Sequence, residues 1–314
     1  MKVTVLEYRT LGKCGPTVPT ICFGAYPIGG GLGTVSENEA INTVQAAIES
    51  GITFIDTAES YGTSEIIIGK AITGRRHEIT LATKLSGSDH SDTHIQSAIN
   101  NSLKYLQTDY IDLYQLHSPQ PRWPIEYTMA SLIKLKEQGK IRYIGVSNFS
   151  DIQTREAIKH GVIHSSQPRY NVLFPHLEES TLDFCKKSGI GVIAHSVLAK
   201  GLLGGKYRPG HTFAVDDERR LFNFFRGQLF IDIHAVTTKL SEWAKSHQRD
   251  IVQLAVAWVL ANKAVTSAIV GMKTIDQVKH VTKAADWKLS QKELLEVHNF
   301  IGDLKPTWEK DPTS

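Results

Sequence analysis

Eight short runs rich in β-branched and aromatic residues recur along this chain, and longer segments of helical periodicity separate them. The runs are residues 21–24, 52–56, 78–84, 110–117, 141–148, 162–167, 191–196 and 266–271. Between them, apolar side chains recur at helical spacing, as in Ala40, Val44, Ala47 and Ile48, so that they share one helical face. Strands that alternate with helices in this way pair in parallel. Eight such units predict an α/β fold of the (β/α)8 TIM-barrel type.

Glycines punctuate this repeat at equivalent positions. Gly51, Gly139, Gly161 and Gly189 each follow a helical pattern and precede a strand. A residue that ends a helix there commonly adopts a left-handed conformation, which glycine tolerates best. We therefore expect four left-handed helix caps.

Two segments depart from the repeat. Residues 7–20 contain a Gly-Pro turn, which predicts a β-hairpin ahead of the first barrel strand. Residues 203–231 mix glycine, proline, charge and aromatics after the seventh strand, and they predict a long, functional loop. Extra helices are expected after the last strand. The 314 residues suit one barrel and are too few for two catalytic domains, so residues 1–314 are expected to form a single domain.

Composition narrows the class of partner. The net charge is +3, from 35 basic and 32 acidic residues, and no basic block is long enough to indicate nucleic-acid or membrane binding. The three cysteines are widely spaced, which favours a reducing cytoplasm over a disulfide framework. The amino terminus lacks the apolar core of a signal peptide, and no apolar run is long enough to span a membrane. A cytoplasmic protein with a small-molecule substrate is expected.

The main rival topology is a doubly wound sheet, which usually carries a dinucleotide-binding fingerprint after its first strand. The glycines at 29–31 and 33 do not complete the G-x-G-x-x-G pattern, and the chain contains no P-loop. The barrel is therefore the preferred fold.

Polar residues close almost every predicted strand, and a barrel gathers these carboxyl ends around one site. They are Asp56, Lys84, His117, Ser147, Asn148, Gln167, His195 and Ser196, with Tyr61 five residues after Asp56. Each one alone has an ordinary structural explanation, such as a helix cap or a solvated strand end. Four titratable groups at the ends of three consecutive strands instead indicate a site for proton transfer.

The residue types suit carbonyl reduction, which needs hydride at carbon and a proton at oxygen. A phenol has a pKa of about 10 and is a slow acid at neutral pH. We expect the Lys84 ammonium to lower the pKa of Tyr61, and Asp56 to pair with that lysine. His117 is expected to orient the substrate oxygen.

These segments resemble the aldo-keto reductase family over nearly the whole chain. GITFIDTAESYG, LATKL and LYQLHSP are similar to its catalytic segments, and the resemblance implies Asp56, Tyr61, Lys84 and His117 as a tetrad with Tyr61 as proton donor. IGVSNF resembles its carboxamide-binding turn, which implies that Ser147, Asn148 and Gln167 hold the nicotinamide amide. The family implies NADPH bound in an extended form without a Rossmann domain.

The remaining cofactor segments are similar to that family with departures. In AHSVLAKGLLGG the resemblance places Ser196, Leu198 and Gly201 along the pyrophosphate, and His195 where a larger aromatic usually stacks on the nicotinamide. GMKTIDQVKHV resembles the adenosine-phosphate loop, and the implied contacts are Gly271, Lys273 at the 2′-phosphate and Gln277 near the adenine. His280 and Val281 replace the usual Glu-Asn pair at the adenine edge.

The preferred function is an NADP-dependent oxidoreductase acting on aldehydes, ketones or sugars, and there are two alternatives. The stretch DHSDTH at 89–94 has metal-ligating side chains, but a polar loop that caps the next helix explains it, and no metal is expected. A metal-dependent barrel hydrolase is the weaker alternative. The stronger one is a cofactor-binding regulatory subunit of a larger membrane complex with little turnover, although the four proposed catalytic residues are all present.

Overall fold

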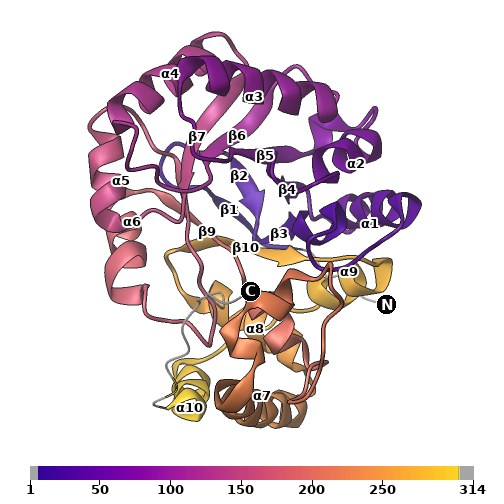
Figure 1. The fold of residues 1–314 in the computed structure, drawn as a ribbon. Helices are drawn as coiled ribbons and strands as arrows, with labels where there is room; N and C mark the ends of the chain where they lie inside the picture. Colours follow the sequence, from indigo (N-terminus) through magenta and orange to yellow (C-terminus); the bar gives the residue numbers. More distant parts are fainter. Residues whose placement is uncertain (1–5, 303, 305–314) are drawn as a thin grey trace.

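The computed structural model describes residues 6–302 and 304, and its centre is a closed barrel of eight parallel strands (Figure 1). The strand order is β10-β3-β4-β5-β6-β7-β8-β9, so each strand pairs with its neighbour in sequence and β10 closes the ring against β3. The predicted fold class is confirmed. The strands are β3 (Ile21–Gly24), β4 (Phe54–Asp56), β5 (Thr80–Leu85), β6 (Ile111–Leu116), β7 (Ile141–Ser147), β8 (Ser165–Gln167), β9 (Gly191–Ala194) and β10 (Val265–Gly271).

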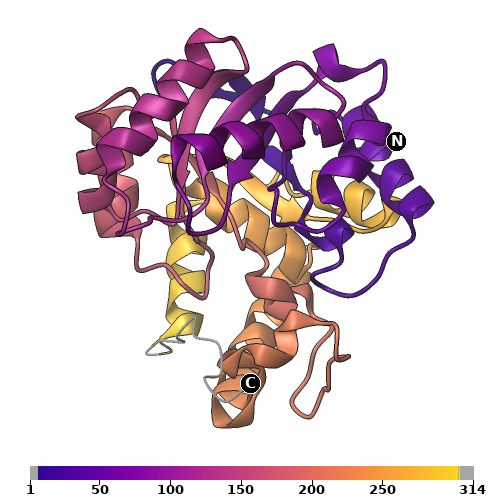
Figure 2. The same cartoon turned by 45° about the horizontal axis from the view of Figure 1, so that its top comes forward.

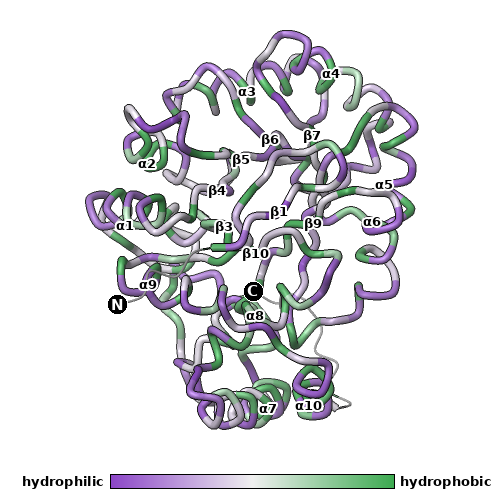
Figure 3. Tube along the Cα trace, turned by 180° about the vertical axis from the view of Figure 1, so that it is seen from behind, coloured by the Kyte–Doolittle hydropathy of each residue, from purple (hydrophilic) through white to green (hydrophobic). Residues whose placement is uncertain are grey.

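Helices surround the barrel and bury one face against it. They are α1 (Glu37–Glu49), α2 (Ser64–Ala71), α3 (Asp92–Tyr105), α4 (Ile125–Glu137), α5 (Asp151–Ile158), α6 (Asp183–Ser188), α8 (Ile251–Ala261) and α9 (Ile275–Thr282). In α1 hydrophobic and hydrophilic residues alternate around the turns (Figure 3), and Ala40, Val44 and Ala47 form its buried face. Helix α8 is buried on nearly all sides. No helix in the described part of the chain has the length and apolarity needed to cross a lipid bilayer.

The predicted amino-terminal hairpin closes the bottom of the barrel. Its strands β1 (Tyr8–Thr10) and β2 (Thr17–Pro19) pair antiparallel. Leu11 and Val18 are fully buried and join the inward-facing strand residues Cys22 and Phe54 in one apolar cluster. The barrel interior is therefore packed with apolar side chains below its carboxyl ends.

The two additional helices, α7 (Gly227–Ser246) and α10 (Gln291–Ile301), lie side by side outside the ring (Figures 1 and 2). Helix α10 is the expected extra helix after the last strand. The predicted loop at 203–231 was too long at its end, because helix α7 begins at Gly227 rather than after residue 231. Its buried positions Phe230, Ile233 and Leu240 continue a helical period from within that segment. Residues 205–226 are irregular apart from short turns at Glu218–Leu221 and Asn223–Phe225.

Three of the four predicted glycine caps have the expected conformation. Gly51, Gly139 and Gly189 have φ values of 85°, 74° and 71°. Gly161 is absent from the left-handed region, so that prediction was wrong. A Cβ at Gly161 would lie 3.0 Å from Ile133 Cδ1, and this glycine instead permits close packing of the segment after α5 against α4.

Candidate active site

A buried ion pair lies at the carboxyl ends of β4 and β5. Lys84 is completely inaccessible to solvent, and its Nζ lies 2.5 Å from Asp56 Oδ1. The ammonium also donates to the Thr57 carbonyl at 2.8 Å and to Tyr61 Oη at 3.3 Å. Burial alone would lower the pKa of Lys84, but Asp56 and Tyr61 outweigh it and raise that pKa. Lys84 therefore stays charged at neutral pH and directs that charge at the Tyr61 oxygen.

The second oxygen of Asp56 is held by two side-chain amides. Gln115 Nε2 donates to Oδ2 at 3.0 Å and Gln167 Nε2 does so at 2.8 Å, while Gln167 also donates to Gln115 Oε1. Sequence reasoning missed Gln115. The sequence contained a signal for it. Gln115 precedes His117 by two residues, and because alternate residues of a strand share one face, Gln115 was expected on the same face as His117.

Tyr61 has hydrogen-bonding groups on two sides of its hydroxyl, Lys84 Nζ and, at 3.4 Å, His117 Nε2. The ring also packs edge-on against Tyr26, with centroids 4.9 Å apart. Burial and the nearby Asp56 charge raise the pKa of Tyr61, and together they outweigh Lys84, which lowers it, so the net direction is upward. The predicted lowering of this pKa by Lys84 is confirmed in direction, but the net shift is upward, because the depth of burial of the phenol is set by folding. Tyr61 is protonated at neutral pH in this state.

His117 is neutral. Burial and the nearby Lys84 charge lower its pKa to about 3. Its Nδ1 lies 2.7 Å from Ser86 Oγ, and its backbone oxygen accepts a hydrogen bond from Asn148 Nδ2 at 3.0 Å. A neutral imidazole has one donor nitrogen and one acceptor nitrogen, so it can hydrogen-bond on both sides of the ring.

The structure brings together the residues at the ends of β7, β8 and β9. Ser147 Oγ donates to the Gln167 carbonyl at 3.1 Å, and Asn148 Oδ1 lies 3.0 Å from His195 Nε2. Asn148 uses its amide nitrogen on the His117 carbonyl, so Oδ1 must accept from His195 Nε2–H. Burial, with the nearby Arg169 charge, holds the pKa of His195 well below its ordinary value. His195 Nδ1 is then the acceptor, and Ser196 Oγ donates to it at 2.9 Å.

The segment after β9 has an unusual backbone. Ser196, Ala199 and Lys200 have positive φ values of 56°, 46° and 56°, and Gly201 has 103°. Such conformations cost about 1–3 kcal/mol each for residues other than glycine, and they concentrate at ligand-binding segments. Successive backbone N–H groups in alternating right- and left-handed conformations form concave anion sites. The pyrophosphate contacts expected of Ser196, Leu198 and Gly201 fall on this segment, and they stay a prediction.

The third segment predicted to contact the cofactor lies at the end of β10 and the start of α9. Gln277 Oε1 accepts from the backbone N–H of Lys273 at 2.7 Å. Lys273 Nζ donates to the carbonyls of Leu32 and Gly33, at 2.6 and 2.8 Å. Gly271 permits close approach of Pro27, whose Cγ would lie 2.6 Å from a Cβ there. A surface pocket beside this segment is lined by Glu39, Asn42, Thr274, Ile275, Asp276 and Lys279.

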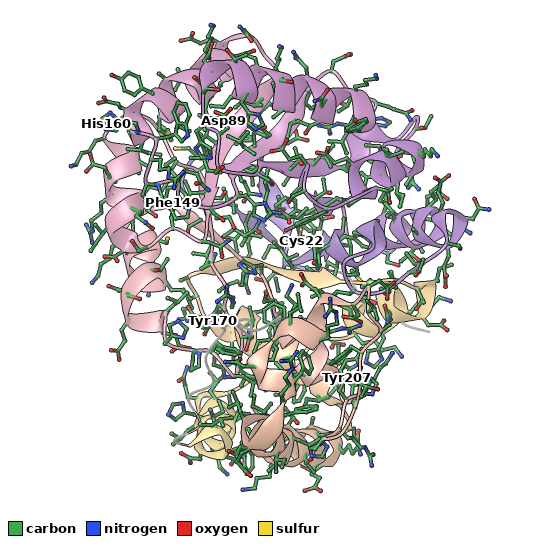
Figure 4. The ribbon with its side chains drawn as sticks, viewed as in Figure 1. Cys22, Asp89, Phe149, His160, Tyr170 and Tyr207 are labelled. Carbon is green, nitrogen blue, oxygen red and sulfur yellow. The ribbon has the colours of Figure 1, made fainter. Side chains whose placement is uncertain are left out.

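His280 and Val281, which stand where the family usually has a Glu-Asn pair, both have structural roles here. His280 pairs with Asp250 at 2.7 Å, and Val281 is buried in the core. Among residues 6–302 and 304, no group of three or more histidine, cysteine or acidic side chains is arranged to hold a metal ion. Asp89, the first residue of the stretch DHSDTH at 89–94, lies in the outer ring, apart from the barrel centre marked by Cys22 (Figure 4).

Comparisons with known proteins place these features in a family. Residues 20–301 match the model described as the aldo/keto reductase family. The chain is 35% identical over 310 residues to the aldo-keto reductase YhdN of Bacillus subtilis, with 94% of each chain covered. It is 31% identical to L-galactose dehydrogenase of Arabidopsis thaliana, with 98% of each covered. The structure of a glycerol dehydrogenase from Gluconobacter oxydans superposes with a TM-score of 0.86 at 29% identity, covering 100% of this chain and 99% of the other.

Proposed function

This chain belongs to the aldo/keto reductase family and is an oxidoreductase of small carbonyl compounds, and we propose that it uses NADP(H) with Tyr61 as proton donor and acceptor. The observation that carries the proposal is the position of Tyr61 Oη, 3.3 Å from Lys84 Nζ and 3.4 Å from His117 Nε2. Residues 1–314 are proposed to act as one domain.

Each of these side chains has a distinct task in carbonyl reduction. Tyr61 is protonated and donates its proton to the substrate oxygen as that oxygen gains negative charge. The buried ammonium of Lys84 stabilises the phenolate that remains, and Asp56 keeps that ammonium in place. His117 is neutral, and in the tautomer with the proton on Nε2 it would fix the position of the carbonyl oxygen by donating a hydrogen bond to it. Alcohol oxidation uses the same groups in reverse.

A bound nicotinamide cofactor supplies or accepts the hydride. Asn148, Ser147 and Gln167 are proposed to hold its amide, and His195 to lie against its ring. Gln167 Nε2 already donates to Asp56, so the side-chain oxygen Oε1 of Gln167 is the atom that would accept from the nicotinamide amide. The left-handed backbone around Ser196 and Gly201, with Leu198 between them, would take the pyrophosphate.

NADP(H) is proposed rather than NAD(H) because Lys273 and Lys279 lie beside the start of α9, where a 2′-phosphate would gain charge-assisted hydrogen bonds. The preference is expected to be small. Lys273 already donates to two carbonyls, and the acidic Glu39 and Asp276 line the surface pocket that contains Lys279. Gln277 would approach the adenine.

The test is a screen of cofactor oxidation and reduction with NADPH, NADH and their oxidised forms. The panel contains glyceraldehyde, benzaldehyde, acetone, glycerol and L-galactose, and it is run with wild type and Tyr61→Phe. Turnover in wild type that is lost in Tyr61→Phe supports the proposal. Cofactor binding without turnover on any substrate would instead support a regulatory subunit.

A further inference from the structure

A chain of two serine hydroxyls leads from His117 to the surface on the side away from Tyr61. His117 Nδ1 lies 2.7 Å from Ser86 Oγ, and Ser86 Oγ donates to Ser60 Oγ at 3.0 Å. Ser86 is only 8% exposed, whereas Ser60 is exposed. On the opposite edge of the ring, Nε2 lies 3.4 Å from Tyr61 Oη. Polar atoms therefore connect the phenol to bulk solvent without passing through the substrate position.

The hydrogen atoms along this chain have one consistent arrangement. Ser86 has a single hydroxyl proton and gives it to Ser60, so its oxygen accepts from His117 Nδ1–H. Because the lowered pKa keeps His117 neutral, Nε2 then has a lone pair and accepts from the Tyr61 hydroxyl. Every member donates towards solvent.

Hydrogen bonds hold the backbones of both Ser86 and His117. Its own N–H donates to the Glu59 carboxylate, and the N–H of Glu59 reaches the Lys84 carbonyl at 3.5 Å. On the neighbouring strand, His117 N–H donates to the Leu85 carbonyl at 3.0 Å. Ser86 and His117 directly follow Leu85 and Leu116, the last paired residues of β5 and β6, so strand pairing brings their backbones together.

We propose that Ser86 and Ser60 form a proton path which, through His117, exchanges protons between Tyr61 and solvent during turnover. The inference rests on the proposed role of Tyr61. In alcohol oxidation Tyr61 takes the substrate proton and passes one to His117 Nε2, while Nδ1 gives one to Ser86, Ser86 one to Ser60 and Ser60 one to water. One proton enters and one leaves, and no electrons move along the path. Carbonyl reduction uses the reverse order.

The first experiment compares Ser86→Ala and Ser86→Thr with Ser88→Ala, an exposed serine on the same loop. The substrate is whichever of glycerol and L-galactose turns over faster. Ser86→Ala is expected to lower kcat of oxidation by about tenfold, because general acid–base steps contribute about 10²–10⁴-fold and water can partly replace a hydroxyl. The KM for cofactor should stay unchanged. Ser86→Thr should restore kcat, and added imidazole buffer should rescue Ser86→Ala but leave wild type unaffected.

A second measurement does not depend on turnover. The ¹⁵N resonances of the His117 ring, assigned by their loss in His117→Gln, should shift at Nδ1 in Ser86→Ala and stay unchanged in Ser88→Ala. Two results would overturn the proton path alone, provided that wild type is active. One is a kcat of Ser86→Ala equal to that of Ser88→Ala, and the other is a loss of kcat in Ser86→Ala that Ser86→Thr does not restore. Absence of turnover in wild type with every cofactor and substrate would overturn the proposed function and the path together.

Discussion

Replacing Asp56 by asparagine should separate the stability of the site from its chemistry. Lys84 is fully buried and the Asp56 side chain is 3% exposed. Removing one member of a buried pair leaves the other charge uncompensated, which costs about 3–5 kcal/mol. An asparagine amide would also present a donor to Lys84 or to the two glutamine amides, where Asp56 presents only acceptors. An unmet buried group adds about 1–3 kcal/mol. We expect a loss of about 4 kcal/mol or more in the free energy of unfolding.

The assay is equilibrium unfolding in urea, with Asp183→Asn as the matched control. Asp183 pairs with Lys187 on an exposed helix surface, so this control should lose less than about 1 kcal/mol. The double variant Asp56→Asn with Lys84→Met should regain stability over Asp56→Asn, because it carries no unpaired buried charge, and it should remain inactive. Two results would refute this reasoning. One is an Asp56→Asn variant that is no less stable than Asp183→Asn, and the other is a double variant that is less stable than Asp56→Asn.

Three further outcomes are expected. Tyr61→Phe should lower kcat by about 100-fold or more with little change in cofactor affinity, because only the transferable proton is lost; near-normal steady-state turnover would contradict its role. Lys273→Met should raise the KM for NADPH by about fivefold, equivalent to ~1 kcal/mol, and leave NADH nearly unchanged; equal losses would remove Lys273 from 2′-phosphate recognition. The folded pKa of His117, about 3, lies below its unfolded value of about 6.5, so the free energy of unfolding should fall as pH drops below about 6.5, with a slope approaching 1.4 kcal/mol per pH unit. His117→Gln should flatten the urea-derived profile between about pH 6.5 and 5.

The strands themselves and the positions of the polar strand ends were predictable because both are local properties. A run such as residues 78–84 shows its character within a few residues, and Lys84 closes it whatever the rest of the chain does. The boundary of α7 was predicted less well. Gly227 was taken as part of a loop, although it lies at the start of the helix, where its φ of 54° does not interrupt the helical period.

Contacts across the barrel depend on register, which the separate patterns do not contain. Gln167 reaches Asp56 across 111 residues of sequence, and Lys273 reaches the Leu32 carbonyl across 241. Sequence reasoning assigned both side chains to cofactor alone. The structure shows that each has a partner within the protein.

The sequence by itself predicted eight βα units in a barrel, with Asp56, Tyr61, Lys84 and His117 at one end. It could do so because strand periodicity and residue type can be recognised within short stretches of sequence. Only the tertiary structure decided the directions in which the pKa values of Tyr61 and His117 shift, since a pKa depends on burial and on the distances to charges that folding creates. The net effect raises the pKa of Tyr61 and lowers that of His117 to about 3. Folding also places the Ser86 hydroxyl against His117, through the pairing of β5 with β6.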